Sequence, residues 1–226
     1  MHSGRQPHAV TLVAVTKSVD VARIAQAVEL GITHLGENRV QEAAGKIPHL
    51  AQDDAGHLCW HMIGHLQSNK INKAAELFSR VDSLDRWDAI ETLERRLDKV
   101  DKTMEVLLEL KLSTEAAKTG ASEDQALRMI GQWEKLRRLR LLGLMTMAPW
   151  PSYENLTRDV FRRCAELFHR INSRGMGPGP LSVLSMGMSG DFEIAIEEGA
   201  TEVRLGRALF GERVQEIVKG IQDERR

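Results

Sequence analysis

Short apolar runs rich in Val, Ile and Leu alternate with longer segments of helical period along almost the whole chain. This alternation limits the possible folds more than any other feature. Strands that are repeatedly followed by helices predict a parallel sheet, because each helix crosses back to start the next strand. The runs predict eight strands, at residues 10–16, 34–37, 59–63, 80–84, 104–112, 139–147, 181–186 and 202–205.

Eight strands in 226 residues leave about 27 residues per unit, which is close to the size of a small (β/α)8 TIM barrel. An open doubly wound sheet is the alternative, but such sheets often carry a glycine-rich loop after the first strand. Here the first strand ends in TKSVD, without glycine. We therefore expect an α/β protein with a single barrel domain over residues 1–226.

Helix boundaries are also marked in the sequence. Gly31 and Gly199 are expected to end helices, and Gln125 completes a capping box at the start of another. The residues expected to cap helix starts are Asp20, Asp85, Ser122, Ser152 and Ser189.

Charge and cysteine usage exclude several functions. The chain has 31 Lys+Arg against 32 Asp+Glu, so it has no overall field that would hold nucleic acid or an anionic membrane. Cys59 and Cys164 lie far apart without metal-type spacing, which favours a reducing compartment. The opening MHSGRQPHAV has no apolar core, and no stretch approaches 18 uninterrupted apolar residues, so we expect neither secretion nor a membrane span. We expect a cytoplasmic protein.

Lys17 follows the apolar run VTLVAVT directly and is therefore expected at the carboxyl end of the first strand. In a barrel this end carries the active face. Partial burial would lower the pKa of the amine and allow the neutral form to attack an aldehyde, forming a Schiff base. A lysine that reaches outward to water is the alternative.

Two glycine-containing turns follow the last two strands. The segment LSMGMSGDFEIAI places Ser185 and Ser189 where a strand turns into a helix, and free amides there would favour an anion. The segment VRLGRALFG brings Arg204, Gly206 and the amide of Arg207 to the next strand end. Barrels often bind phosphate between these two loops, although ordinary turns would have the same sequence.

Two other kinds of site are disfavoured. His57, Cys59, His61 and His65 could share a strand face with metal-ligand character, but no further ligand follows at an obvious spacing. The sequence therefore favours no metal site, with one inward-facing histidine as the simpler explanation. A hydrolase is also disfavoured, because no GxSxG motif surrounds Ser185 or Ser189.

Taken together, several strings in chain order resemble the pyridoxal 5'-phosphate (PLP) homeostasis proteins, from Thr11 to Gly211. They are LVAVTK, HLGENRVQEA, WHMIGHLQSNK, VDSLDR, KTG, LRLLGLMTM, LSMGMSGDFEIAI and VRLGRALFG. This family is similar to the barrel of alanine racemase, a fold-type III PLP-binding barrel.

The resemblance implies roles for individual residues. Lys17 matches the lysine that forms the Schiff base with PLP, and Arg204 is similar in position to the racemase arginine that faces the pyridine nitrogen. Lys118 matches a basic residue that lies near the mouth of the barrel in this family. The matched phosphate contacts are Ser185, Gly187, Met188, Ser189, Gly206 and Arg207, and the matched cofactor-lining residues are Asn38, His61 and Met145.

The sequence departs from the family pattern at three places. Val19 and Asp20 stand where relatives usually have Lys and often Pro, and Arg207 stands where Thr or Ser is common. The chain begins at the GRQP loop, so we expect it to lack the helix that precedes this loop in relatives. The first departure weakens the case for a second lysine at the mouth.

The resemblance implies a PLP carrier or regulator in intracellular PLP homeostasis, without robust catalysis. Racemization in the related enzyme needs a second domain that supplies a tyrosine, whereas the one tyrosine here is Tyr153 at an expected helix start. Two alternatives stay open: a PLP-dependent amino-acid racemase, and a cofactor-free aldolase that uses Lys17. The implied partners are PLP and the apoenzymes that use it, with the chain as a monomer or weak dimer.

Overall fold

A closed barrel of eight parallel strands forms the centre of the molecule. The computed structural model describes residues 4–50, 58–113, 119–149 and 153–211. Each strand pairs with its neighbours in chain order, and β8 pairs with β1 to close the barrel. The predicted TIM barrel is therefore confirmed. The strands are β1 (Thr11–Val15), β2 (His34–Glu37), β3 (Cys59–Met62), β4 (Arg80–Leu84), β5 (Met104–Leu110), β6 (Leu139–Thr146), β7 (Val183–Ser185) and β8 (Glu202–Leu205).

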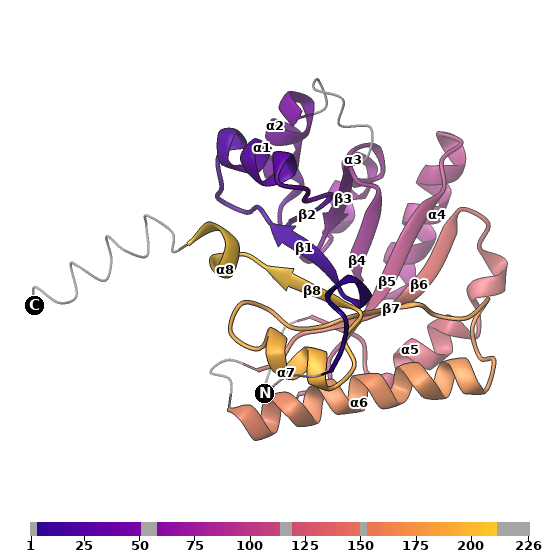
Figure 1. Ribbon diagram of the computed structural model, residues 1–226. Coiled ribbons are helices and arrows are strands. Elements are labelled where there is room, and N and C mark those ends of the chain that lie inside the picture. The colour runs from indigo at the N-terminus through magenta and orange to yellow at the C-terminus, as the bar shows by residue number, and fades with distance from the viewer. Residues whose placement is uncertain (1–3, 51–57, 114–118, 150–152, 212–226) are drawn as a thin grey trace, which may run out of the picture.

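Helices lie around the outside of the strands, and the long α6 runs beside α7 (Figure 1). A helix follows every strand, as the alternation predicts. The α-helices are α1 (Val21–Glu29), α2 (Val40–Leu50), α3 (Ile71–Leu77), α4 (Trp87–Lys99), α5 (Glu123–Ile130), α6 (Glu154–Ser173), α7 (Phe192–Glu197) and α8 (Arg207–Phe210). Short 3-10 turns are η1 (Pro7–Ala9), η2 (Ser68–Lys70) and η3 (Trp133–Lys135).

Most of the expected helix boundaries are confirmed. The Asp20 carboxylate accepts the Arg23 amide, and Ser122 forms a reciprocal capping box with Gln125. Gly31 and Gly199 follow their helices with φ of +98° and +99°, a backbone conformation that favours glycine.

Two expected caps are wrong, and a third lies outside the described residues. Helix α4 begins after Arg86, and Asp85 instead accepts the amide of Gly120 from another loop. Helix α7 begins after Asp191, while Ser189 accepts amides from α8 and its preceding residue. In both cases the side chain accepts a hydrogen bond from another loop and does not cap the helix that follows it. Ser152 is the cap that is not described.

The two faces of the strands pack against different surroundings. One face joins the helices in an apolar layer, represented by Leu35, Trp60 and Val81. The other face encloses charge: Arg80 on β4 contacts Glu202 on β8, four strands away around the closed barrel. A contact between opposite strands must cross the interior, so the barrel centre is polar.

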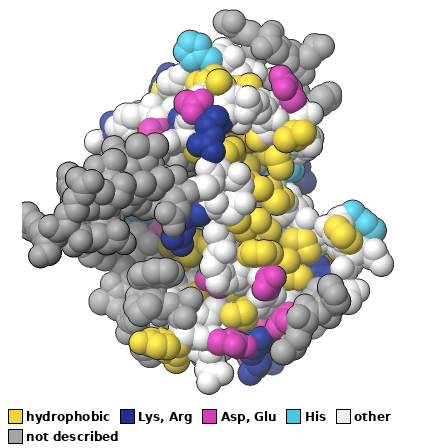
Figure 2. Space-filling model, turned by 60° about the vertical axis from the view of Figure 1, so that its left-hand side comes forward, with side chains coloured by type: hydrophobic (Ala, Val, Ile, Leu, Met, Phe, Trp, Pro, Cys, Tyr) yellow, Lys and Arg dark blue, Asp and Glu magenta, His cyan; other side chains and the backbone are white. Residues whose placement is uncertain are grey.

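The outer surface carries mixed side chains. Figure 2 shows acidic and basic groups scattered over the face turned to the viewer, with a band of apolar side chains between them. Among the described residues, no helix has both the length and the apolar character that crossing a bilayer requires.

Candidate functional site

The carboxyl end of β1 positions Lys17, which is half-buried two residues after the strand. The residues before and after Lys17 are held by hydrogen bonds. Lys46 Nζ donates to the Thr16 carbonyl at 2.8 Å, and the Ser18 amide donates to Glu42 Oε2 at 3.0 Å. Ser18 has a φ of +61°, so the chain turns sharply just after Lys17. The lysine therefore sits on a fixed backbone at the barrel mouth.

Arg204 links β8 to the ends of β6 and β7 inside the barrel. Its guanidinium donates to Ser185 Oγ at 2.7 Å and to the Thr146 carbonyl at 2.9 Å, and all three residues are buried. Burial lowers the pKa of Arg204, although a guanidinium keeps its charge in proteins. The structure thus brings Ser185 and Arg204 together, as expected for one site.

The turn after β7 depends on a glycine. Gly187 has a φ of +97°, and a Cβ there would lie 2.6 Å from the Cβ of Ala195. Its carbonyl accepts the Arg204 amide at 3.0 Å, while the Met188 amide donates to Asp191. The turn after β7 is therefore tied to strand β8 through the main chain.

Ser189 completes this junction. Its Oγ accepts the amides of Gly206 and Ala208, each at 3.2 Å. Gly206 in turn packs beside Val15, with 3.5 Å between the Val15 Cβ and the place of a Gly206 Cβ. Two amide donors therefore converge close to the strand end that carries Lys17. The Arg207 side chain is exposed, so a contribution from this residue would come through its main chain.

The other predicted site residues lie around the barrel. Met145 is fully buried and pairs in register with Ser185 and Glu109 on the adjacent strands. Asn38 follows β2, and its carbonyl would be only 2.3 Å from a Cβ at Gly64. The contacts of His61 are with His34 and Asp82. Lys118 and His57 lie outside the described residues.

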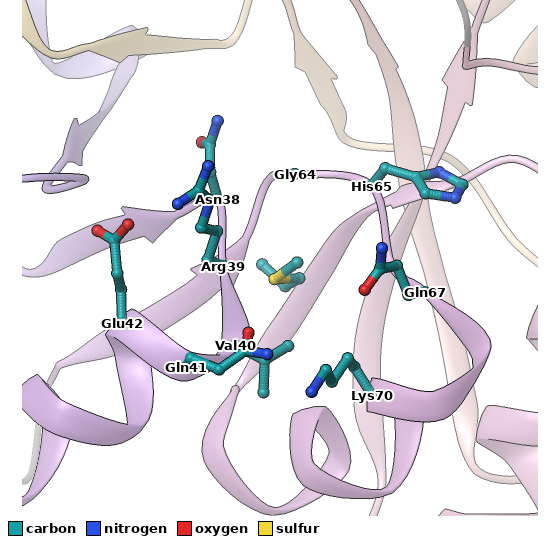
Figure 3. Close-up of a pocket in the computed structure, with 10 residues that line it drawn as sticks. Asn38, Arg39, Val40, Gln41, Glu42, Gly64, His65, Gln67 and Lys70 are labelled. Atoms are coloured by element: carbon teal, nitrogen blue, oxygen red, sulfur yellow. The ribbon is translucent and has the colours of Figure 1, made fainter.

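A cavity of about 660 Å³ opens beside the ends of β2 and β3. Figure 3 shows Arg39, Gln41 and Glu42 on one wall and Gln67 and Lys70 on the other. Only Asn38 of its lining was predicted as a site residue. The strings HLGENRVQEA and WHMIGHLQSNK contained the others, but polar residues after a strand do not by themselves indicate a cavity.

The charged interior was also missed. Arg80 Nε donates to Asp82 Oδ1 at 2.6 Å, and its Nη2 donates to Glu202 Oε2 at 2.5 Å. Burial opposes the charged state of Asp82, but the charges and hydrogen bonds of Arg80 and His61 together outweigh it and keep the pKa of this carboxyl well below its usual range. His61 Nδ1 lies 3.0 Å from Asp82 Oδ2. The barrel interior is thus held by ionic contacts.

Glu109 on β5 is a buried carboxyl that accepts the Thr119 hydroxyl at 2.9 Å. Burial raises its pKa to about 7, more than the Thr119 hydrogen bond lowers it. Because the folded pKa lies above the unfolded one, this group stabilises the fold at acidic pH. That contribution is lost as the pH rises through about 7.

We therefore expect Glu109→Gln to remove a pH-dependent loss of stability. Between about pH 5 and pH 8 the unfolding free energy of the wild type should fall by about 2–3 kcal/mol more than that of the variant. Urea unfolding at both pH values measures this. Glu105→Gln, on the same strand but 38% exposed, is the control and should follow the wild type. Parallel pH profiles of the wild type and Glu109→Gln would contradict the prediction.

A barrel with a lysine at the end of its first strand and joined loops after its last two strands defines the class of the alanine racemase barrel. The family model described as "Alanine racemase, N-terminal domain" matches residues 3–214. The alanine racemase of Clostridium difficile has this fold, with a TM-score of 0.74 at 12% identity over 92% of this chain and 54% of that one.

Relatives with higher sequence identity identify the family within this class. A protein of Synechocystis is 38% identical over 92% of this chain and 94% of its own, and one of Pseudomonas aeruginosa is 40% identical over 93% and 88%. Both are named pyridoxal phosphate homeostasis protein. The structure of PipY from Synechococcus elongatus, with PLP bound, matches with a TM-score of 0.84 at 35% identity, covering 92% of this chain and 95% of that one. The chain belongs to the pyridoxal phosphate homeostasis protein family, as the sequence motifs predict.

Proposed function

We propose that this protein binds PLP at the mouth of the barrel and acts in PLP homeostasis as a carrier or regulator without robust catalysis. The observation that carries the proposal is the convergence of the Gly206 and Ala208 amides on Ser189, beside the strand end that bears Lys17. The PLP-bound relative PipY supports the choice of ligand. The predicted cytoplasmic location and apoenzyme partners belong to the same proposal.

The residues present fit this cofactor chemically. PLP supplies an aldehyde, which condenses with an amine, and a phosphate dianion. Lys17 offers the amine, and the Ser189 hydroxyl, which accepts the amides of Gly206 and Ala208, offers its own O–H to a phosphate oxygen. Gly187 leaves no room for a side chain in the turn beside them. The donor set therefore matches both reactive ends of the ligand.

Each group in the chain has a separate task. Lys17 would hold the ligand covalently, while the Ser189 hydroxyl, held by the amides of Gly206 and Ala208, would donate to its phosphate. The bond from Arg204 to Ser185 fixes the guanidinium inside the barrel, where it can face the ring nitrogen. Met145 near the end of β6 and Asn38 after β2 lie on opposite sides of the closed barrel and would line the cofactor. Gly187, Met188 and Arg207 are proposed to belong to the phosphate-binding loops. His61 is proposed to line the cofactor from the inside of the barrel.

Ser189→Ala should weaken binding through the phosphate. We expect PLP affinity to fall by about 10-fold to 100-fold, because hydrogen bonds to charged groups are strong. Affinity for pyridoxal, which has no phosphate, should change by about 2-fold or less. Fluorescence titration of both ligands measures the difference. Ser173→Ala, an exposed hydroxyl at the end of α6, is the control. Equal losses for both ligands would contradict a phosphate role.

The residues around the site favour binding of PLP over catalysis with it. A permanently charged guanidinium at the ring nitrogen keeps that nitrogen unprotonated, which weakens the ring as an electron sink. Tyr153, the one tyrosine, is 65% exposed before α6. PLP-loaded protein incubated with L-alanine should therefore release no D-alanine at an enzymatic rate. Chiral chromatography checks this, and steady racemization or decarboxylation would overturn the non-catalytic part of the proposal.

A further inference from the structure

A second cluster of reactive side chains lies at the other end of the barrel from Lys17. His34 and Cys59 are the first residues of β2 and β3 and face each other in register, with His61 two residues further on β3. His34 pairs with Val13, so Lys17 lies four residues, or about 13 Å, further along the strand direction. The cluster thus lies toward the opposite end of the barrel from Lys17, and it shares one residue, His61, with those proposed to line PLP.

The ligand atoms of these three residues are already close together. One ring nitrogen of each histidine and the thiol sulfur of Cys59 lie within 4.8 Å of one another. His34 Nδ1 is 2.9 Å from His61 Nε2. Two nitrogens bound tetrahedrally to one zinc ion lie about 3.3 Å apart. A shift of a few tenths of an ångström would therefore open this hydrogen bond into a metal site.

The surroundings of His61 favour a cation at this place. Its Nδ1 lies 3.0 Å from Asp82 Oδ2, which leaves Nε2 facing His34. A carboxylate behind a histidine is the arrangement that orients imidazole ligands of metals. His61 and Asp82 are fully buried, whereas His34 and Cys59 are partly exposed. An ion could therefore enter from the side of His34 and Cys59.

The charged side chains near the cluster also favour a bound cation. Asp82 and Glu202 are both bonded to Arg80, so two carboxylates share one guanidinium. Thiolate and imidazole together are ligands that zinc and cobalt prefer over magnesium or calcium.

We propose that His34, Cys59 and His61 form a site for a borderline-soft divalent metal ion of the zinc type, with Asp82 positioning His61. The fourth coordination position is left for water or another small ligand. This differs from the expectation of no metal drawn from the sequence. That expectation rested on residues near Cys59 alone and did not include His34, which comes from the neighbouring strand.

Cobalt is the probe, because its absorption reports both thiolate ligation and coordination number. The full-length Lys17→Ala protein, freed of metal and PLP, excludes chelation by a PLP Schiff base. We expect one Co²⁺ per chain, with a thiolate charge-transfer band and the strong visible bands of four-coordinate cobalt, both removed by added Zn²⁺. In this background Cys59→Ser should abolish the charge-transfer band, and Cys164→Ser, which alters the buried cysteine of α6, should leave it intact.

A second variant protects the test against misfolding. His34→Asn keeps the thiol, so it should retain some charge-transfer absorption while Zn²⁺ affinity falls by at least about 100-fold in calorimetric competition. Circular dichroism verifies that each variant is folded. The proposal is overturned if the parent protein gives no charge-transfer band, if the band survives in folded Cys59→Ser, or if it requires Cys164.

Discussion

We expect Lys17→Ala to abolish covalent capture of PLP while the protein stays folded. After borohydride treatment the wild type should carry one PLP-derived adduct on Lys17, and the variant should carry none at that site. The reason is chemical, since the side chain at this position is the amine that condenses with the aldehyde. Loss of a half-buried lysine at a strand end should cost little stability. Near-visible absorbance and peptide mass spectrometry measure the adduct.

Lys111→Ala is the matched control for this experiment. Lys111 directly follows β5 at the same end of the barrel and is also half-buried, so general lysine reactivity at the mouth would affect both. The control should label like the wild type. An adduct that persists in Lys17→Ala and disappears in Lys111→Ala would move the site to β5. A wild type that cannot be loaded at all would remove the PLP proposal and favour the aldolase alternative.

The strand pattern was predictable because apolar runs and glycine stops are local signals. The strands at 34–37, 80–84 and 202–205 have the predicted bounds. The predicted strand 181–186 is shorter in the structure, at Val183–Ser185. Asn172 on α6 accepts the Leu181 amide and donates to its carbonyl, so these groups do not join the sheet. A side-chain contact from the preceding helix set that boundary, and the apolar run alone could not reveal it.

The proposed mouth residues were predictable for the same reason, since Lys17 and the two glycine turns directly follow apolar runs. The cavity beside β2 and β3 and the polar barrel interior were not. Arg80 and Glu202 are 122 positions apart, and only closure of the barrel brings them together. His34 likewise meets Cys59 through strand register. Sequence spacing predicts which side chains share a strand, but not which strands face one another.

Arg80→Met should be the most destabilising single change in the barrel interior. The substitution leaves the buried carboxylates of Asp82 and Glu202 without the guanidinium that both contact at 2.5–2.6 Å. Breaking a buried ionic contact in this way costs about 3–5 kcal/mol, a large share of the stability of an ordinary domain. Urea unfolding near neutral pH measures the loss. Arg140→Met removes an exposed arginine paired with Glu105 at 3.3 Å and should cost less than about 1 kcal/mol.

A combined variant separates unpaired charge from lost packing. Adding Asp82→Asn and Glu202→Gln to Arg80→Met removes both stranded charges while keeping similar side-chain shapes, and the amide oxygen introduced by Asp82→Asn can still accept from His61. We expect this triple variant to regain part of the lost stability, because the cost lies mainly in the uncompensated carboxylates. If the triple variant is no more stable than Arg80→Met alone, packing around the arginine stem, and not charge, holds the centre of the barrel.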